Sequence, residues 1–195
     1  MLPYNLDTVF VNKEQVIENI NACIVNIDTY INGKRSIKNL KDLYNDIHWV
    51  LSYWTGQTYV GIEKEEDIKN AFQLFFTKFY YLINDLRKNG NRLYEKMFSK
   101  NLLYQGTVYR YLGSHCETKN GQIKIDYNGV YVSWNKIKDD YYIKSKLLGK
   151  KTLLTCEIKD KYFGIDLDKF GVCVGKEKEV VFPTIKDTIV KVEVI

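Results

Sequence analysis

Apolar residues in the first half of the chain recur at three- and four-residue steps, the period of one face of an α-helix. This spacing predicts three long helices and a short fourth one, over residues 12–31, 36–54, 63–88 and 91–98. Glycines at positions 33 and 90 follow the first and third helix, where a helix usually ends. The third helix carries a broad apolar stripe rich in phenylalanine, and the pattern predicts that this stripe lies in a core.

The pattern changes near residue 104 to short apolar runs separated by glycine-containing turns. Six strands are expected, over residues 107–112, 122–125, 130–133, 153–158, 180–182 and 188–194. A run of helices followed by a run of strands predicts an α+β fold and not a parallel βαβ fold. We therefore expect a helical region over 1–100 and a strand-rich core over 101–195, packed as one compact unit.

Charge and composition narrow the classes of partner. The 29 Lys and Arg residues are interspersed with 24 Asp and Glu residues, so the net charge of +5 indicates a mixed solvated surface and does not favour nucleic acid. No apolar run approaches the roughly 18 residues that a bilayer span needs. The first ten residues also lack a signal-peptide pattern, so we expect no membrane partner and a cytoplasmic location where the protein is made.

Cysteine and histidine spacing gives no sign of a metal site. The four cysteines are scattered without a CxxC pair, and two histidines do not complete a metal-ligand pattern. The adjacent pair His115 and Cys116 could suggest a nucleophile with its base, but neighbours in a strand face opposite sides, which disfavours this interpretation. We expect buried thiols and no metal.

Three separated segments carry candidate chemistry. The first is Tyr109-Arg110, an arginine near the end of a strand, and the second is residues 131–135, a strand end with the small hydroxyl of Ser133. The third is residues 175–183, where Glu177 and Glu179 precede an apolar strand. In a strand this spacing puts both carboxylates on one face, where they repel unless a cation or polar ligand uses them. Each segment by itself also fits an ordinary strand with a solvated edge.

Taken in order, the three segments resemble the R-S-E class of mono-ADP-ribosyltransferases, which includes clostridial exoenzymes that modify Rho, actin-modifying toxins and arginine-specific ecto-transferases of vertebrates. The family pattern is an aromatic-Arg strand, a Ser-x-Ser strand, and a Glu/Gln-x-Glu followed by an apolar run. The resemblance covers residues 103–195. It departs from the pattern at Tyr111, where the family has a glycine, and at Asn135, where it has a second serine.

The resemblance implies a core of two packed, mainly antiparallel sheets that binds NAD as a co-substrate. Arg110 would hold NAD phosphate, with Tyr109 and Asn135 beside it, and Ser133 would orient Glu179. Cleavage of the nicotinamide glycosidic bond passes through an oxocarbenium-like state, and Glu179 would stabilise its positive charge.

The acceptor is implied by the first carboxylate of the pair. In the family a Glu at this position accompanies arginine modification, so Glu177 implies an arginine of a target protein as the acceptor. A guanidinium is always protonated, and a nearby carboxylate is needed to position it and take its proton. The preceding loop, residues 168–175, corresponds to the substrate-recognition turn of the family, with Phe170 as a contact or as an ordinary packed aromatic.

Several alternatives stay open from the sequence. The same site could mainly hydrolyse NAD, or the fold could have lost catalysis and serve in binding, for which Tyr111 and Asn135 are the evidence. The helical region could cover the NAD cleft, as in toxin members of the family, or could bind a partner through Trp49, Tyr53 and Trp54. The resemblance is compatible with a toxin, an injected effector or a phage protein, and a nucleic-acid acceptor is also open.

Overall fold

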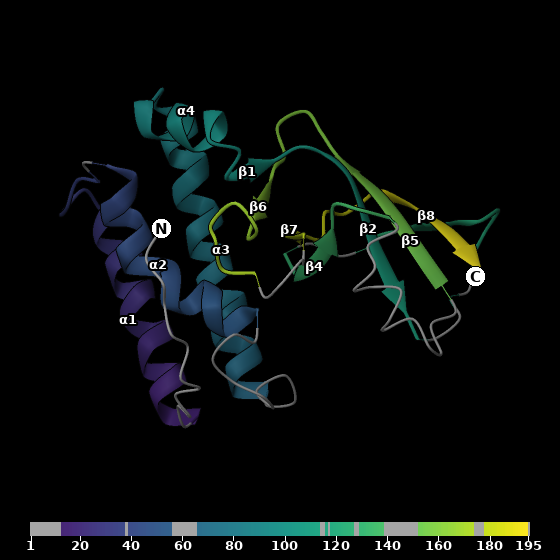
Figure 1. The fold of residues 1–195 in the computed structure, drawn as a ribbon, viewed down its shortest axis with the longest axis horizontal. Helices are drawn as coiled ribbons and strands as arrows, with labels where there is room; N and C mark the ends of the chain where they lie inside the picture. Colours follow the sequence, from purple (N-terminus) through teal and green to yellow (C-terminus); the bar gives the residue numbers. More distant parts are fainter. Residues whose placement is uncertain are drawn as a thin grey trace. The chain divides into compact units, whose positions relative to one another are not determined.

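The computed structural model describes residues 13–37, 39–55, 66–113, 116, 118–126, 129–138, 152–173 and 178–194. The chain divides into two compact units, Met1–Lys96 and Met97–Ile195 (Figure 1). Each unit has its own element types, since the first is helical and the second contains the strands. The observed class is α+β, as the order of helical and strand patterns predicts.

The four predicted helices are confirmed, with shifted ends. They are α1 (Lys13–Ile31), α2 (Leu40–Trp54), α3 (Glu66–Lys88) and α4 (Arg92–Ser99), the last of which contains the boundary between the units. The second helix begins four residues later than predicted, because the Asn39 side chain accepts hydrogen bonds from the backbone N–H groups of Lys41 and Asp42. Such a cap satisfies donors that the first turn leaves unpaired.

The aromatic stripe of α3 lies in the core of the helical unit. Phe75, Phe76 and Phe79 are fully buried. The ring of Trp54 packs edge-to-face on Phe76, with the ring centroids 4.8 Å apart. No helix among the described residues is long and apolar enough to span a bilayer.

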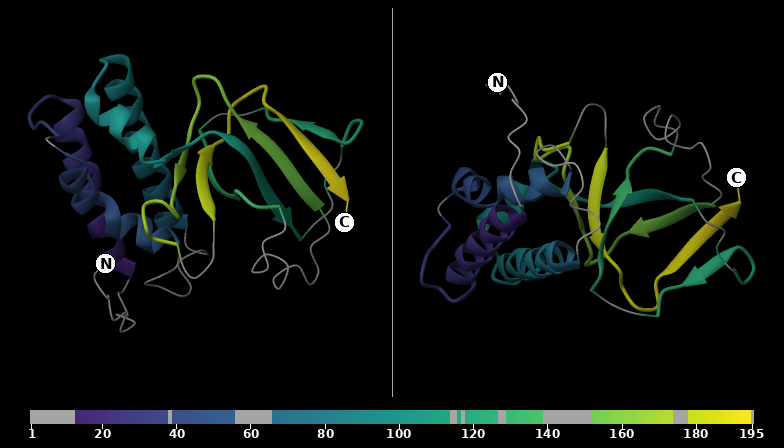
Figure 2. Two further views of the ribbon diagram at one scale, coloured as in Figure 1. Left: turned by 45° about the horizontal axis from the view of Figure 1, so that its top comes forward. Right: turned by 90° about the horizontal axis from the view of Figure 1, so that it is seen from below.

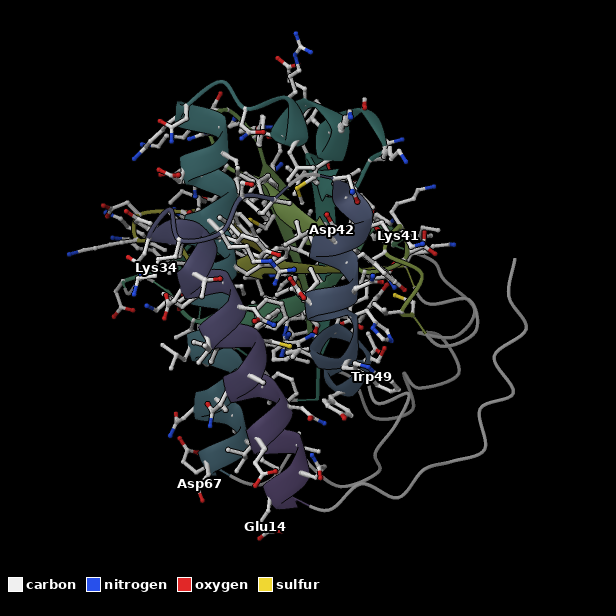
Figure 3. All side chains as sticks on the ribbon, turned by 90° about the vertical axis from the view of Figure 1, so that its left-hand side faces the viewer. Glu14, Lys34, Lys41, Asp42, Trp49 and Asp67 are labelled. Carbon is white, nitrogen blue, oxygen red and sulfur yellow. The ribbon has the colours of Figure 1, made fainter. Side chains whose placement is uncertain are left out.

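The three aromatic residues proposed as partner anchors have different environments. Tyr53 is buried, and Trp54 is half-buried against α3. Trp49 is 51% exposed and lies on the outer side of α2, where Figure 3 labels it. A core role therefore holds for two of the three residues, and a partner-binding role stays a hypothesis for Trp49 alone.

Eight described strands form one antiparallel sheet in the order β1-β6-β7-β4-β2-β5-β8-β3. Their bounds are β1 (Leu103–Tyr104), β2 (Gly106–Leu112), β3 (Gln122–Lys124), β4 (Tyr131–Asn135), β5 (Thr152–Ile158), β6 (Gly164–Asp166), β7 (Glu179–Pro183) and β8 (Ile189–Val194). The expectation of two packed sheets is wrong. Strands β2 and β4 are joined by the pair Tyr109 and Asn135, which links two half-sheets, β1-β6-β7-β4 and β2-β5-β8-β3, into one sheet.

The curvature of this sheet builds the core of the second unit (Figure 2). Buried side chains from both half-sheets pack together: Val108, Trp134, Cys156, Ile158, Val180, Phe182 and Val190. Because β2 and β4 are paired at a single position, the half-sheets can bend toward each other there and enclose these residues. The fold therefore brings β2, β4 and β7, which carry Arg110, Ser133 and Glu179, into neighbouring positions.

Candidate functional site

The register between β4 and β7 decides which side chains share a face. Ser133 pairs with Val181, and Asn135 pairs with Glu179. Directly opposite residues of a sheet point to the same side and alternate residues share that side. Ser133, Asn135 and Glu179 therefore lie on one face, while the intervening Trp134 points toward the buried core.

Ser133 and Glu179 are in direct contact across these strands. The Ser133 hydroxyl donates a hydrogen bond to Oε1 of Glu179, and both residues are half-buried. A hydroxyl that donates to one carboxylate oxygen restricts the rotation of the group and leaves the second oxygen oriented. The structure thus places a hydrogen bond at the position where the resemblance implies one.

Arg110 reaches the same strand from β2. The Lys136 N–H donates to the Lys178 carbonyl at 2.9 Å, so the backbone groups of Lys136 point toward β7. Backbone groups of successive strand residues point alternately to the two neighbouring strands, so those of Ser133, three residues earlier, point the other way, toward β2. One Arg110 nitrogen, Nη1, donates to the Ser133 carbonyl at 2.6 Å, just beyond the single β2–β4 pair.

Asn135 and Tyr111, the two departures from the family pattern, both form hydrogen bonds with residues that follow β4. The Asn135 side chain accepts a hydrogen bond from the Ile137 N–H at 2.7 Å. The Tyr111 hydroxyl donates to the Lys138 carbonyl. Both side chains therefore hold the residues that follow β4, while Tyr109 is half-buried opposite Asn135.

Of the two residues predicted to recognise the acceptor, Phe170 and Glu177, the structure describes only Phe170. Phe170 is only 6% exposed, which favours the packing role over contact with an acceptor. Its N–H donates to the Asp166 carbonyl at 3.0 Å, so it belongs to a turn after β6. Glu177 lies outside the described residues, and its predicted role in selecting arginine stays a prediction.

A charged cluster that none of the sequence motifs predicted surrounds the ends of β4, β6 and β7. Lys136 Nζ lies 2.7 Å from Asp166 and 3.2 Å from Asp168, and Lys178 Nζ lies 2.8 Å from Asp168. The side chains of Lys136 and Asp166 are only 13% and 2% exposed. A signal was present in the sequence, because Asp166 interrupts an otherwise apolar run from Phe163 to Leu167.

The pKa values of the two aspartates in the cluster are shifted in opposite directions. Burial raises the pKa of Asp166 above its usual range, although hydrogen bonds from Lys136 and from the Lys169 N–H oppose the rise. Burial acts in the same direction on Asp168, but hydrogen bonds from Lys178 and Lys136 outweigh it and lower the pKa of that group.

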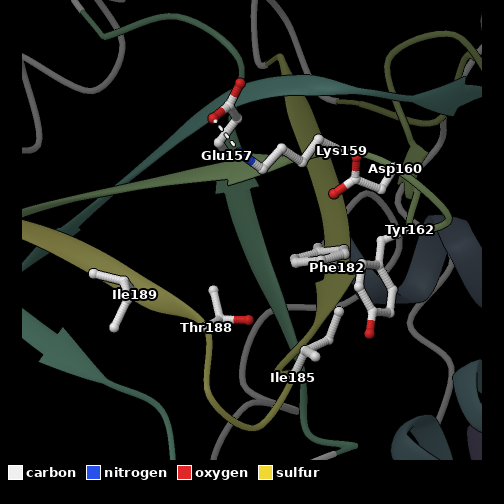
Figure 4. Close-up of a pocket in the computed structure, with 8 residues that line it drawn as sticks. All are labelled: Glu157, Lys159, Asp160, Tyr162, Phe182, Ile185, Thr188 and Ile189. Carbon is white, nitrogen blue, oxygen red and sulfur yellow. Dashed lines mark ion pairs between the residues drawn. The ribbon is translucent and has the colours of Figure 1, made fainter.

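Two hollows of the second unit lie away from the Ser133–Glu179 contact. One, of about 320 Å³, is lined by Tyr162, Phe182, Ile185 and Thr188, and by Glu157 and Lys159, which form an ion pair at 3.5 Å (Figure 4). The other, of about 300 Å³, borders Lys136, Asp166 and Tyr104. Neither hollow includes Arg110, Ser133 or Glu179.

Comparison of the chain with family models finds no match, and comparisons with curated proteins and with solved structures also find none. Among the described residues, no group of three or more His, Cys, Asp or Glu side chains could hold a metal ion.

Proposed function

We propose that the chain is a mono-ADP-ribosyltransferase that transfers ADP-ribose from NAD to an arginine of a target protein. The observation that carries the proposal is the hydrogen bond from Ser133 to Glu179, with Arg110 bonded to the Ser133 carbonyl. Three motifs that are 23 and 46 residues apart thereby meet on adjacent strands. The order of the motifs along the chain and the contact of Ser133 with Glu179 support the proposal.

The chemistry of these three groups suits cleavage of the nicotinamide glycosidic bond. The C–N bond breaks with its electron pair going to the pyridinium nitrogen, so nicotinamide leaves neutral and positive charge develops on the ribose. A half-buried carboxylate, oriented by Ser133, stabilises that charge more than a fully solvated one would. The guanidinium of Arg110, which donates to the Ser133 carbonyl, offers a planar fork of donors that matches phosphate oxygens of the same substrate.

Transfer needs a second step on the acceptor. A guanidinium nitrogen of the target forms the new bond to the ribose carbon and loses a proton, for which Glu177 is the proposed base. Hydrolysis of NAD needs only the three described residues, with water as the acceptor. A glycohydrolase is therefore the second candidate function, supported by the same Ser133–Glu179 contact.

The proposal is tested by incubating the purified protein and a cell lysate with NAD that is labelled in the adenylate. Labelled protein bands and free nicotinamide are followed for the wild type, Glu179→Gln, Glu177→Gln and the control Glu193→Gln. Glu193 is an exposed strand glutamate paired with Lys138. We expect loss of both signals in Glu179→Gln, loss of labelling alone in Glu177→Gln, and no change in the control.

The outcomes separate the candidates. Nicotinamide release without labelled protein would favour the glycohydrolase. An absence of both signals in the wild type, across lysates of different origin, would contradict both enzymatic proposals and favour a binding protein that keeps the fold without the reaction.

A further inference from the structure

Two positively charged side chains lie next to the end of β7 that carries Glu179. Lys136 and Lys178 are joined by the ladder bond from the Lys136 N–H to the Lys178 carbonyl, one position beyond the pair of Asn135 and Glu179. Like charges directly opposite each other across two strands repel and destabilise the pairing. Two ammonium groups at this position would therefore favour separation of the strands immediately beside Glu179.

Asp168 lies between the two ammonium groups. Its Oδ1 is 2.8 Å from Lys178 Nζ, and its Oδ2 is 3.2 Å from Lys136 Nζ. Asp166 also pairs with Lys136, at 2.7 Å, whereas Asp168 bonds both ammonium groups and so links them by two attractive contacts from the turn that follows β6. In the same region the Leu167 N–H donates to the Glu179 carbonyl at 3.0 Å.

The cluster acts from the opposite face of the sheet. Side chains of successive strand residues alternate, so Lys136 and Lys178 point away from the face of Ser133 and Glu179. Asp168 can therefore influence the Glu179 side chain only through the backbone of β7, whose first residue is Glu179. We infer that Asp168 is a positioning residue for Glu179, which fixes the first residue of β7 by neutralising the two lysines behind it.

This inference deepens the proposed function and rests on it for its catalytic consequence. The test substitution is Asp168→Asn, which keeps the shape of the side chain and removes its charge. The matched control is Asp187→Asn, because Asp187 forms an exposed ion pair with Lys124 at 2.7 Å in the turn between β7 and β8. The rescue variant combines Asp168→Asn with Lys178→Met, which removes one of the two repelling charges.

Two measurements are made on each full-length variant. Amide hydrogen exchange of Lys136 and Leu167, the two N–H groups bonded at this strand end, is expected to accelerate about fivefold in Asp168→Asn. The kcat for nicotinamide release is expected to fall about 100-fold, as for a misplaced catalytic group, with the KM for NAD nearly unchanged. The rescue variant should recover most of both, and the control should match the wild type.

Unchanged exchange in Asp168→Asn, or a rescue variant no better than Asp168→Asn, would overturn the positioning role. A fall of kcat with unchanged exchange would also overturn it, because Asp168 would then act by another route. If the wild type releases no nicotinamide, the proposed function fails, and the exchange measurement still decides whether Asp168 holds this strand end.

Discussion

Removal of the Lys136 ammonium should destabilise the protein strongly and in a pH-dependent way. Its partner Asp166 is 2% exposed at the side chain, and the Lys136–Asp166 distance is 2.7 Å. The Asp166 carboxylate accepts hydrogen bonds from Lys136 Nζ and, at 3.1 Å, from the Lys169 N–H. In Lys136→Met it keeps only the second of these two bonds. Breaking a buried pair by removing one member costs about 3–5 kcal/mol.

The same structure sets an upper limit on this cost. The buried carboxyl can become neutral, and the price of protonating a group of ordinary pKa 3.8 is about 1.4 kcal/mol per pH unit above that value. The limit is therefore about 4.4 kcal/mol at pH 7 and about 1.6 kcal/mol at pH 5. Since the folded-state pKa is raised, the penalty grows as the pH rises above 3.8, and acid conditions relieve it.

Urea unfolding at pH 5 and pH 7, followed by circular dichroism and tryptophan fluorescence, measures both values. We expect Lys136→Met to lose about 3–4 kcal/mol at pH 7 and less than about 2 kcal/mol at pH 5. The variant Lys136→Met/Asp166→Leu, which removes both charges, should stay within about 1.5 kcal/mol of the wild type at either pH. Equal losses at the two pH values in the single variant would refute this reasoning.

Three further predictions test the fold. Gly164→Ala should lower the free energy of unfolding by about 1–3 kcal/mol, because its Cβ would lie 2.2 Å from Val180 Cγ1, and an unchanged melting temperature would contradict this packing. Burial raises the pKa of Cys23 to about 12 and of Cys156 to about 11. Iodoacetamide at pH 8 should therefore alkylate Cys116 and Cys173 first, which mass spectrometry would detect. Asn39→Ala should cost about 1 kcal/mol in urea unfolding through loss of the α2 cap, whereas an equal loss in Asn39→Asp would point to another cause.

The helices were predictable because their information is local. Apolar spacing and terminal glycines lie within each segment, and all four helices appear close to the predicted positions. The start of α2 was misplaced because Asn39, and not an earlier residue, makes the capping hydrogen bonds. Strands β1 and β6 were missed because they have two and three residues, too few to show an alternating pattern.

The arrangement of the strands was not predictable from such local patterns. One pair, Tyr109 with Asn135, decides that the half-sheets form a single sheet, and those residues are 26 positions apart in the sequence. The contact of Ser133 with Glu179 was expected from the resemblance, whereas the charged cluster was not. Lysines and aspartates usually lie on the solvated surface, and only the fold shows that Lys136 and Asp166 are buried together.

Release of nicotinamide from NAD by the purified protein is the most direct test of the central claim. The account predicts release by the wild type, a loss of about 100-fold or more in Glu179→Gln with the fold intact by circular dichroism, and full activity in Glu193→Gln. Equal release by the wild type and Glu179→Gln, or none by the wild type, would contradict the assignment of Glu179 as the catalytic carboxylate.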